Sequence, residues 1–297
     1  MENEENDAGL LERDTGARPA LFEAQWNDDV HHALHVATTG ETFGYYGDYE
    51  DAISALARAM AEGFVYQGEV MPYRGETRGQ PSAHLPPSAF VSFLHNHDQI
   101  GNRALGERLH QLCSPQALEA ATALLLLSPM IPLMFMGDEV NAREPFLFFT
   151  DHHGELAEAV REGRRNEFAD FAAFHDPERR ERIPDPNALS TFEQSAPVIA
   201  DHPHAQLYRQ LLSLRHRHIV PHLPGARALG AQVLADSAVS ARWRLGNGSL
   251  LQIDLNLSAT PLDHPATAPV LFETPALQGA QLPPFSARVT LSPVGEH

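Results

Sequence analysis

Two apolar runs in this chain end abruptly in polar side chains. Residues 90–94 (FVSFL) precede the polar stretch 95–99 (HNHDQ), and residues 131–136 (IPLMFM) precede the tripeptide 137–139 (GDE). Both runs have the length of a buried strand, and residues 115–127 between them have the pattern of a helix that begins with proline. This order of strand, helix and strand is the repeat of a β/α barrel, in which functional groups lie at the carboxyl ends of strands. Polar residues after a strand can also simply cap the next helix.

A third strand is expected at residues 21–25 (LFEAQ), before a helix that starts near Asn27 and ends at Gly40. His31 and His35 stand one turn apart on this helix, a spacing that could bind a metal ion. The glutamate that completes the zinc-protease pattern is absent, so we favour imidazole rings placed along a substrate groove.

The hydrophobic period changes in the last quarter of the chain from helical to two. Residues 239–245 alternate, residues 246–248 (GNG) can turn the chain, and residues 251–257 alternate again. This pattern predicts an antiparallel hairpin with one buried face. The sequence therefore predicts a partial β/α barrel over residues 1–220 and a small antiparallel β-domain over residues 221–297.

An aromatic loop and a charged helix add candidate contacts. Tyr45 and Tyr46 follow the first predicted helix, and their rings could either stack on sugar faces or pack the loop against the core. Residues 151–168 predict a charged helix whose arginines and glutamates are expected to face water.

Composition narrows the function classes. The formal net charge of -18 opposes binding of nucleic acid, so a neutral substrate fits better. The longest apolar runs are interrupted by Ser128 and Pro132, so no membrane-spanning helix and no membrane partner are expected. The acidic first residues lack the features of a signal peptide, and the single cysteine, Cys113, suits a reducing cytoplasm. We expect a cytoplasmic protein.

Several motifs together give the chain a specific resemblance. NHDQIGNR after FVSFL, FMGDE, REPFLFFTDH, VREGRRNEF and AQWNDDVHHALH are similar to segments of the malto-oligosyltrehalose trehalohydrolases, glycoside hydrolases of the α-amylase superfamily. The similarity runs from Glu2 into the C-terminal β-domain. It implies a (β/α)8 barrel, of which this chain is the C-terminal half with about three to four strands, followed by a β-sandwich. It also implies hydrolysis of the α-1,4 bond next to the trehalose end of maltooligosyltrehalose, which releases trehalose.

The resemblance also assigns residues. Retaining glycosidases use one carboxyl group as acid and a second as nucleophile. By similarity Glu2 is the general acid, Asp98 is a third acid that stabilises the distorted sugar, and His97 hydrogen-bonds the same ring. Further substrate contacts are expected from Asn96, Gln99, Arg103, Trp26, Asp28, Tyr45, Tyr46 and Glu139. No metal and no cofactor are expected.

The chain also departs from the family pattern. The family nucleophile lies in a Gly-Phe-Arg-x-Asp motif ahead of the general acid, and this sequence begins at Met1. Three parallel strands cannot close a barrel, and Glu2 has no strand before it, so we expect an N-terminally truncated enzyme whose terminus is frayed.

Two alternatives stay open. One is a non-catalytic carbohydrate-binding or complementing fragment, which would pair with a separately encoded N-terminal half. The other is a different α-amylase relative, such as a branching enzyme.

A second departure lies at residues 137–139. There Gly-Asp-Glu replaces the usual Gly-Glu-Glu of the family, which leaves the substrate contacts at this position open.

Overall fold

The computed structural model describes residues 1–168, 178, 181–276 and 280–293. The chain divides into two compact units. The first unit comprises Met1–Leu94, Cys113–Leu133 and Leu207–His297, and the second comprises His95–Leu112 and Met134–Gln206. The predicted boundary at residue 220 falls inside the first unit and stays a prediction. The described part of the chain holds no helix with the length and apolarity that a bilayer crossing requires.

A small parallel sheet lies in the first unit. It has the order β1 (Gln25–Trp26), β4 (Phe90–Ser92) and β5 (Ile131–Pro132), with both strand pairs parallel. Met1 extends it, because its nitrogen donates to the carbonyl of Ala24 at 2.7 Å and its carbonyl accepts from Trp26 N at 2.9 Å. This is the hydrogen-bond pattern of a parallel strand. The partial barrel expected from the sequence is therefore supported by parallel strands in consecutive order.

The strands are shorter than predicted, and the prediction that residues 131–136 form a fully buried strand is wrong. β5 has only two residues, both half-buried, and the side chains of Met134 and Met136 are 44% and 45% exposed. The ladder ends when Leu133 N donates to Ser92 O at 2.8 Å. Pro132 has no N–H to donate, which favours a short strand at the edge of a sheet.

The predicted helices of the first unit are confirmed, together with their caps. α1 (Asp28–Thr39) starts where the Asn27 side chain accepts from Val30 N, and it ends at Gly40 with φ 74°. α4 (Pro115–Leu127) starts where the Ser114 side chain accepts from Ala117 N. α2 (Ala52–Glu62) lies between them in sequence. These boundaries follow from short-range capping interactions, which the sequence displays directly.

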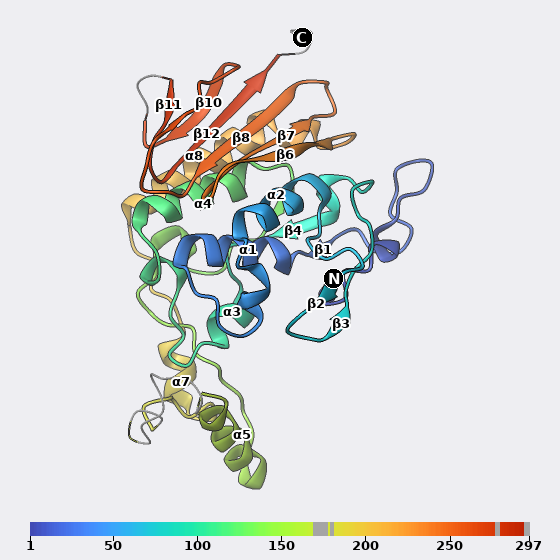
Figure 1. Ribbon diagram of the computed structural model, residues 1–297. Helices are drawn as coiled ribbons and strands as arrows, with labels where there is room; N and C mark the ends of the chain where they lie inside the picture. Colours follow the sequence, from blue (N-terminus) through green and yellow to red (C-terminus); the bar gives the residue numbers. More distant parts are fainter. Residues whose placement is uncertain (169–177, 179–180, 277–279, 294–297) are drawn as a thin grey trace. The chain divides into compact units, whose positions relative to one another are not determined.

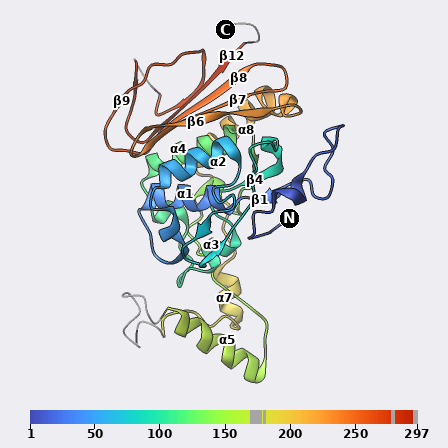
Figure 2. The same ribbon diagram turned by 45° about the vertical axis from the view of Figure 1, so that its right-hand side comes forward.

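An antiparallel sheet forms from the C-terminal part of the first unit, and the hairpin predicted there is confirmed. Its order is β10 (Val270–Thr274), β12 (Ser286–Ser292), β8 (Leu250–Asn256), β7 (Ala238–Arg244) and β6 (Arg227–Ala235). Helices α2 and α4 pack against this sheet, as Figures 1 and 2 show. The other elements among the described residues are η1 (Ala8–Leu11), η2 (Gly44–Tyr49), β2 (Val70–Met71), β3 (Glu76–Thr77), η3 (Pro87–Ala89), α3 (His97–Gly101), η4 (Leu109–Gln111), η5 (Asp138–Val140), α5 (Gly154–Glu167), α7 (Leu189–Gln194), α8 (Pro203–His218), η7 (Val220–His222), β9 (Leu262–Asp263) and β11 (Gln281–Leu282).

The second unit is built around α3, α5 and α7. Arg164 of α5 is 7% exposed and donates to the backbone carbonyls of Gly101 at 2.6 Å and Arg103 at 2.9 Å. The expectation that the arginines of this helix face water is therefore wrong for Arg164. A guanidinium can donate to several backbone carbonyls at once, and these hydrogen bonds offset part of the free energy that its burial costs.

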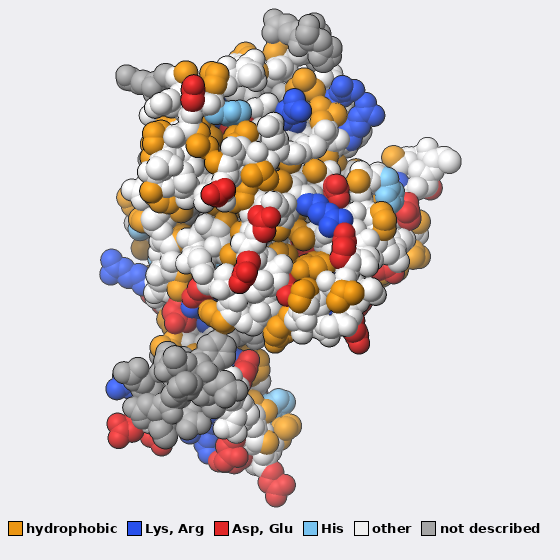
Figure 3. Space-filling model, in the orientation of Figure 1, with side chains coloured by type: hydrophobic (Ala, Val, Ile, Leu, Met, Phe, Trp, Pro, Cys, Tyr) orange, Lys and Arg blue, Asp and Glu red, His pale blue; other side chains and the backbone are white. Residues whose placement is uncertain are grey.

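On the face that Figure 3 draws, acidic side chains are spread among hydrophobic ones, in keeping with the net charge of -18.

A buried arginine ties the end of α4 to α8 in the first unit. Arg215 is 4% exposed and donates to the carbonyl oxygens of Leu126 at 3.1 Å, Ser128 at 2.5 Å and Met130 at 2.7 Å. The carbonyls at the end of a helix have no partner within that helix, so this guanidinium satisfies groups that would otherwise be buried without hydrogen bonds. Burial lowers the pKa of Arg215 to about 10, and the side chain remains charged at neutral pH.

We expect Arg215→Met to lower the free energy of unfolding by about 3 kcal/mol, because it leaves buried carbonyl oxygens without donors. Urea unfolding of the two proteins, followed by circular dichroism, measures this difference. Arg217→Met is the matched control, since Arg217 lies two residues away on α8 and is exposed. It should change the free energy of unfolding by less than about 0.5 kcal/mol. Equal effects of the two substitutions would contradict the role assigned to Arg215.

Candidate active site

The polar cluster after β4 forms the start of helix α3. Asn96 is 1% exposed, and its side chain accepts from Asp98 N at 2.8 Å, while Gln99 Oε1 accepts from Asn96 N at 2.9 Å. These two side chains close a capping box and fix the turn. His97 and Asp98 are directed outward, with side chains 49% and 58% exposed, and His97 Nε2 lies 3.3 Å from Asp98 Oδ1. The turn therefore presents a carboxylate and an imidazole side by side.

The two polar clusters predicted at strand ends meet within the second unit. His95 Nε2 lies 2.6 Å from Asp138 Oδ1, and Asp138 Oδ2 accepts from Phe135 N at 2.9 Å. Both side chains of this pair are about nine-tenths buried. The pair joins the segment that carries His97 and Asp98 to the segment after β5. Sequence reasoning missed His95, whose only signal was its place beside the polar motif.

A buried arginine holds the segment after β5. Arg108 is 1% exposed and donates to the carbonyls of Met136 and Glu144, each at 2.8 Å. Its guanidinium lies 3.9 Å from Asp138 Oδ1. Burial lowers the pKa of Arg108, and the nearby carboxylate of Asp138 opposes that shift. Gly137 has φ 90°, and a Cβ there would meet the Ala142 side chain at 2.7 Å, so only glycine fits.

The two carboxylates of residues 137–139 have different surroundings. Asp138 is occupied by His95 and by the backbone of its own turn, whereas Glu139 is half-buried in η5. Arg103 is half-buried as well, and its Nε donates to Glu107 Oε2 at 3.3 Å. The substrate roles of Glu139 and Arg103 stay predictions.

Glu2 lies in the first unit, and its surroundings correct the expectation of a frayed terminus without a strand. Its side chain is exposed, but Met1 on one side is hydrogen-bonded to β1. On the other side, the carbonyl of Asn3 accepts from Gln25 Nε2 at 2.9 Å. The backbone on both sides of Glu2 is thus held, because β1 and the Gln25 amide supply the hydrogen bonds that a frayed segment would lack.

The aromatic and histidine candidates of the first unit are mostly buried. Tyr46 is 5% exposed, its hydroxyl lies 2.9 Å from His31 Nε2, and its ring stacks on His35 at 4.3 Å. His31 and His35 are 0% and 4% exposed, so the expectation that they line a groove is wrong. His31 Nδ1 lies 2.5 Å from the carbonyl oxygen of Leu94, which directly precedes the polar segment 95–99. Of the two interpretations of the tyrosines, packing describes Tyr46.

Three further candidates are partly accessible. Tyr45 is half-buried, with its ring 4.9 Å from that of His32. Trp26 is the last residue of β1 and is half-buried. Its ring packs edge-on against the ring of Phe93, and the two ring centroids are 5.8 Å apart. Asp28 is half-buried in the first turn of α1. Glu2, Trp26, Asp28, Tyr45 and Tyr46 thus belong to the first unit, and Asn96, His97, Asp98, Gln99, Arg103 and Glu139 belong to the second.

Comparison with known proteins gives consistent matches. Residues 226–289 match a family described as a domain of unknown function, DUF3459. A malto-oligosyltrehalose trehalohydrolase from a Rhizobium strain is 40% identical over 285 residues, which are 89% of this chain and 45% of that protein. A protein of the same name from Deinococcus radiodurans is 45% identical over 205 residues, 66% of this chain and 34% of that protein.

A solved structure also matches nearly the whole chain. It is described as a putative alpha amylase from Salmonella typhimurium, and it is 44% identical with a TM-score of 0.88. The match covers 98% of this chain and 50% of that one. The chain therefore spans at most about half the length of the relatives it matches.

Proposed function

The chain is a homologue of the malto-oligosyltrehalose trehalohydrolases, and on that premise we propose that it supplies part of the active site of such an enzyme. The reaction is retaining hydrolysis of the α-1,4 bond next to the trehalose end of maltooligosyltrehalose. Glu2 protonates the leaving oxygen, and Asp98 stabilises the sugar as positive charge develops on it. The attacking carboxylate comes from the part of a trehalohydrolase that lies outside the region matched by this chain.

The order of the parallel strands is the observation that carries this proposal. Met1, β1, β4 and β5 run in parallel, so their carboxyl ends share one edge of the sheet. Glu2 follows Met1 directly, and the turn with His97 and Asp98 follows β4. Functional groups of β/α barrels lie at this edge. We take the sheet to be part of a (β/α)8 barrel and the antiparallel sheet to belong to a C-terminal β-sandwich.

The other polar candidates are assigned to the sugar around the cleaved bond. His97 hydrogen-bonds the ring that Asp98 holds, and Trp26, Asp28, Tyr45, Arg103 and Glu139 provide further contacts. Asn96 and Gln99 act mainly through the shape of the turn, because each caps the backbone of α3. We propose a cytoplasmic location, which suits the single, partly buried Cys113.

The test uses this chain together with the part of a trehalohydrolase relative that it does not match, as one polypeptide or as two coexpressed chains. We call this the assembled protein. With maltooligosyltrehalose it should release trehalose, and the maltooligosaccharide product should first appear as the α-anomer in a proton NMR time course. The chain alone is the control and should release none. Failure of a correctly folded assembled protein to release trehalose would refute the proposal.

The same assay separates the alternatives. A branching enzyme would form α-1,6 linkages from plain maltooligosaccharide and would leave the trehalose end attached. A non-catalytic carbohydrate-binding fragment would bind the glucan without any turnover in the assembled protein. Activity of the two coexpressed chains, without a covalent link, would support a separately encoded partner half.

A further inference from the structure

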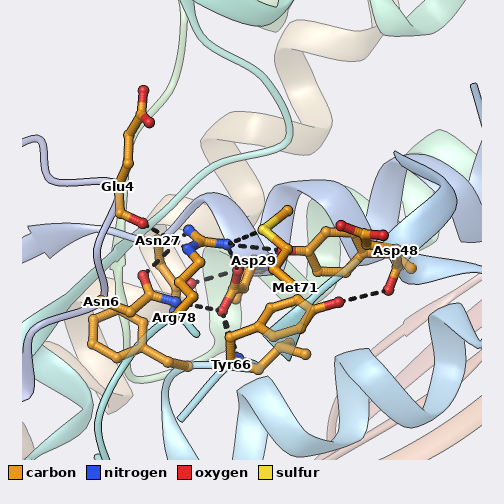
Figure 4. Close-up of polar contacts among 12 residues, drawn as sticks. Glu4, Asn6, Asn27, Asp29, Asp48, Tyr66, Met71 and Arg78 are labelled. Carbon is orange, nitrogen blue, oxygen red and sulfur yellow. Dashed lines mark hydrogen bonds and ion pairs between the residues drawn. The ribbon is translucent and has the colours of Figure 1, made fainter. Parts of the chain in front are cut away.

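A buried carboxylate and guanidinium, those of Asp29 and Arg78, contact one another in the first unit, as Figure 4 shows. Asp29 is 0% exposed and Arg78 is 4% exposed, and Arg78 NH1 donates to Asp29 Oδ1 at 2.9 Å. The other donors to Asp29 are Tyr49 OH at 2.6 Å, Asn6 Nδ2 at 2.9 Å, Val65 N at 2.6 Å and Tyr66 N at 3.3 Å. Burial raises the pKa of Tyr49 well above its usual value, so this hydroxyl remains a donor. The buried carboxylate is fully hydrogen-bonded, the condition under which a buried ion pair is tolerated.

Arg78 also reaches in a second direction, toward the segment that carries Glu2. Its Nε donates to the carbonyl of Glu4 at 2.6 Å, and its NH2 donates to Asn6 Oδ1 at 3.4 Å. Asn6 is 1% exposed and has φ 52°, a left-handed conformation that asparagine tolerates better than most residues. The guanidinium therefore bridges a fixed carboxylate in α1 and the backbone two residues after Glu2.

Two anchors thus bracket Glu2. Met1 is bonded to β1, and residues 3–6 are bonded to Gln25, Asp29 and Arg78. The Glu2 side chain itself is exposed, so the position of its carboxyl group depends on the backbone that these anchors hold. A displacement of about 1 Å in a catalytic group can cost on the order of 10²-fold in rate.

We propose that Arg78, oriented by Asp29, is a positioning residue for the general acid Glu2. This inference rests on the proposed function, which assigns Glu2 its role. A lysine could keep the ion pair with Asp29, but its single ammonium group lacks the planar fork that bonds Asp29 and the Glu4 carbonyl together.

Hydrogen exchange in the chain as given tests the physical connection, independently of any activity. Arg78→Lys is the main variant, because it keeps a cation beside Asp29, and Arg78→Met is the more severe one. Both should raise at least tenfold the exchange rates of the Trp26 and Gln80 amides, which donate to the carbonyls of Met1 and Asn6 on the two sides of this segment. Arg74→Met is the matched control, because Arg74 pairs with the side chains of Glu4 and Glu5 at the surface. It should leave these rates within about twofold. Equal rates in Arg78→Lys and the unchanged chain would overturn the proposal.

Kinetics of the assembled protein tests the positioning role. Arg78→Lys should lower kcat on maltooligosyltrehalose about 30-fold with KM changed less than about threefold, because a misplaced acid slows bond cleavage more than binding. With a maltooligosyl fluoride, whose leaving group needs little protonation, the loss should shrink to less than threefold. A merely structural defect would lower both rates equally, and that outcome would overturn the proposal.

Two results distinguish the proposed function from the positioning role of Arg78. An unmodified assembled protein that releases no trehalose refutes the proposed function, whereas the exchange result still decides whether Arg78 holds residues 4–6. An active assembled protein in which Arg78→Lys behaves like the unmodified protein on both substrates refutes the positioning role alone.

Discussion

Asp98→Asn should lower kcat of the assembled protein on maltooligosyltrehalose by about 10³-fold, equivalent to about 4 kcal/mol of transition-state stabilisation. Hydrogen bonds from a carboxylate to the sugar hydroxyls strengthen as the ring distorts toward the oxocarbenium-like transition state, and they supply several kcal/mol in glycosidases. Asparagine keeps the size of the side chain and removes its charge. The fold should be unaffected, because the α3 turn is closed by Asn96 and Gln99 rather than by the Asp98 carboxylate.

Asp151→Asn is the control for this substitution. Asp151 lies in the same unit, its side chain is 98% exposed, and it undergoes the same change of charge. The kcat of the Asp151→Asn variant should stay within about twofold of the kcat of the unmodified assembled protein. If Asp98→Asn retained more than a tenth of the original kcat, Asp98 would not be the stabilising acid.

The second large effect is a loss of stability in acid caused by His32. Its side chain is 9% exposed, and its Nδ1 has no hydrogen-bond partner among the described residues. Burial lowers the pKa of His32 to about 3, although Asp29 acts in the opposite direction. The unfolded chain takes up this proton near pH 6.5. Between pH 6.5 and about 3 the unfolded state therefore binds more protons, and stability falls as the pH falls.

Above pH 6.5 His32 costs no stability, and the loss grows to about 4 kcal/mol as the pH falls to 3. We compare the free energies of unfolding of the chain and of His32→Gln at pH 7 and pH 4, from urea titrations. Between these two pH values the unmodified chain should lose about 3 kcal/mol more than His32→Gln, because glutamine does not titrate. Parallel pH dependences of the two proteins would show that His32 is not the group responsible.

Features set by nearby residues could be predicted from the sequence. Asn27, Ser114 and Gly40 mark helix ends by interactions within four residues, and the hairpin formed by β7 and β8 follows from alternation around a short turn. The turn with His97 and Asp98 was also found in this way. Each of these predictions needed only a local stretch of sequence.

Features set by distant residues could not be predicted. Arg78 lies in an irregular, glycine-rich segment and contacts Asp29, 49 residues earlier. Arg108 and Arg215 bond to carbonyls 28 to 89 residues away. In the sequence all three look like ordinary solvated arginines, because their burial depends on tertiary packing. For the same reason His31 and His35 appeared to line a groove, although the fold places their rings inside the core.

Helix α4 has a consequence for how this protein folds and how it can be divided. It contacts β8, β10 and β12 of the antiparallel sheet, and it also contacts α1, so nearly every side of the helix is covered. The antiparallel sheet is covered by α2 and α4, and both helices also contact α1, which in turn contacts β4 of the parallel sheet. The two sheets should therefore unfold in one cooperative transition, and limited proteolysis should not release the C-terminal β-strands as an independently stable fragment.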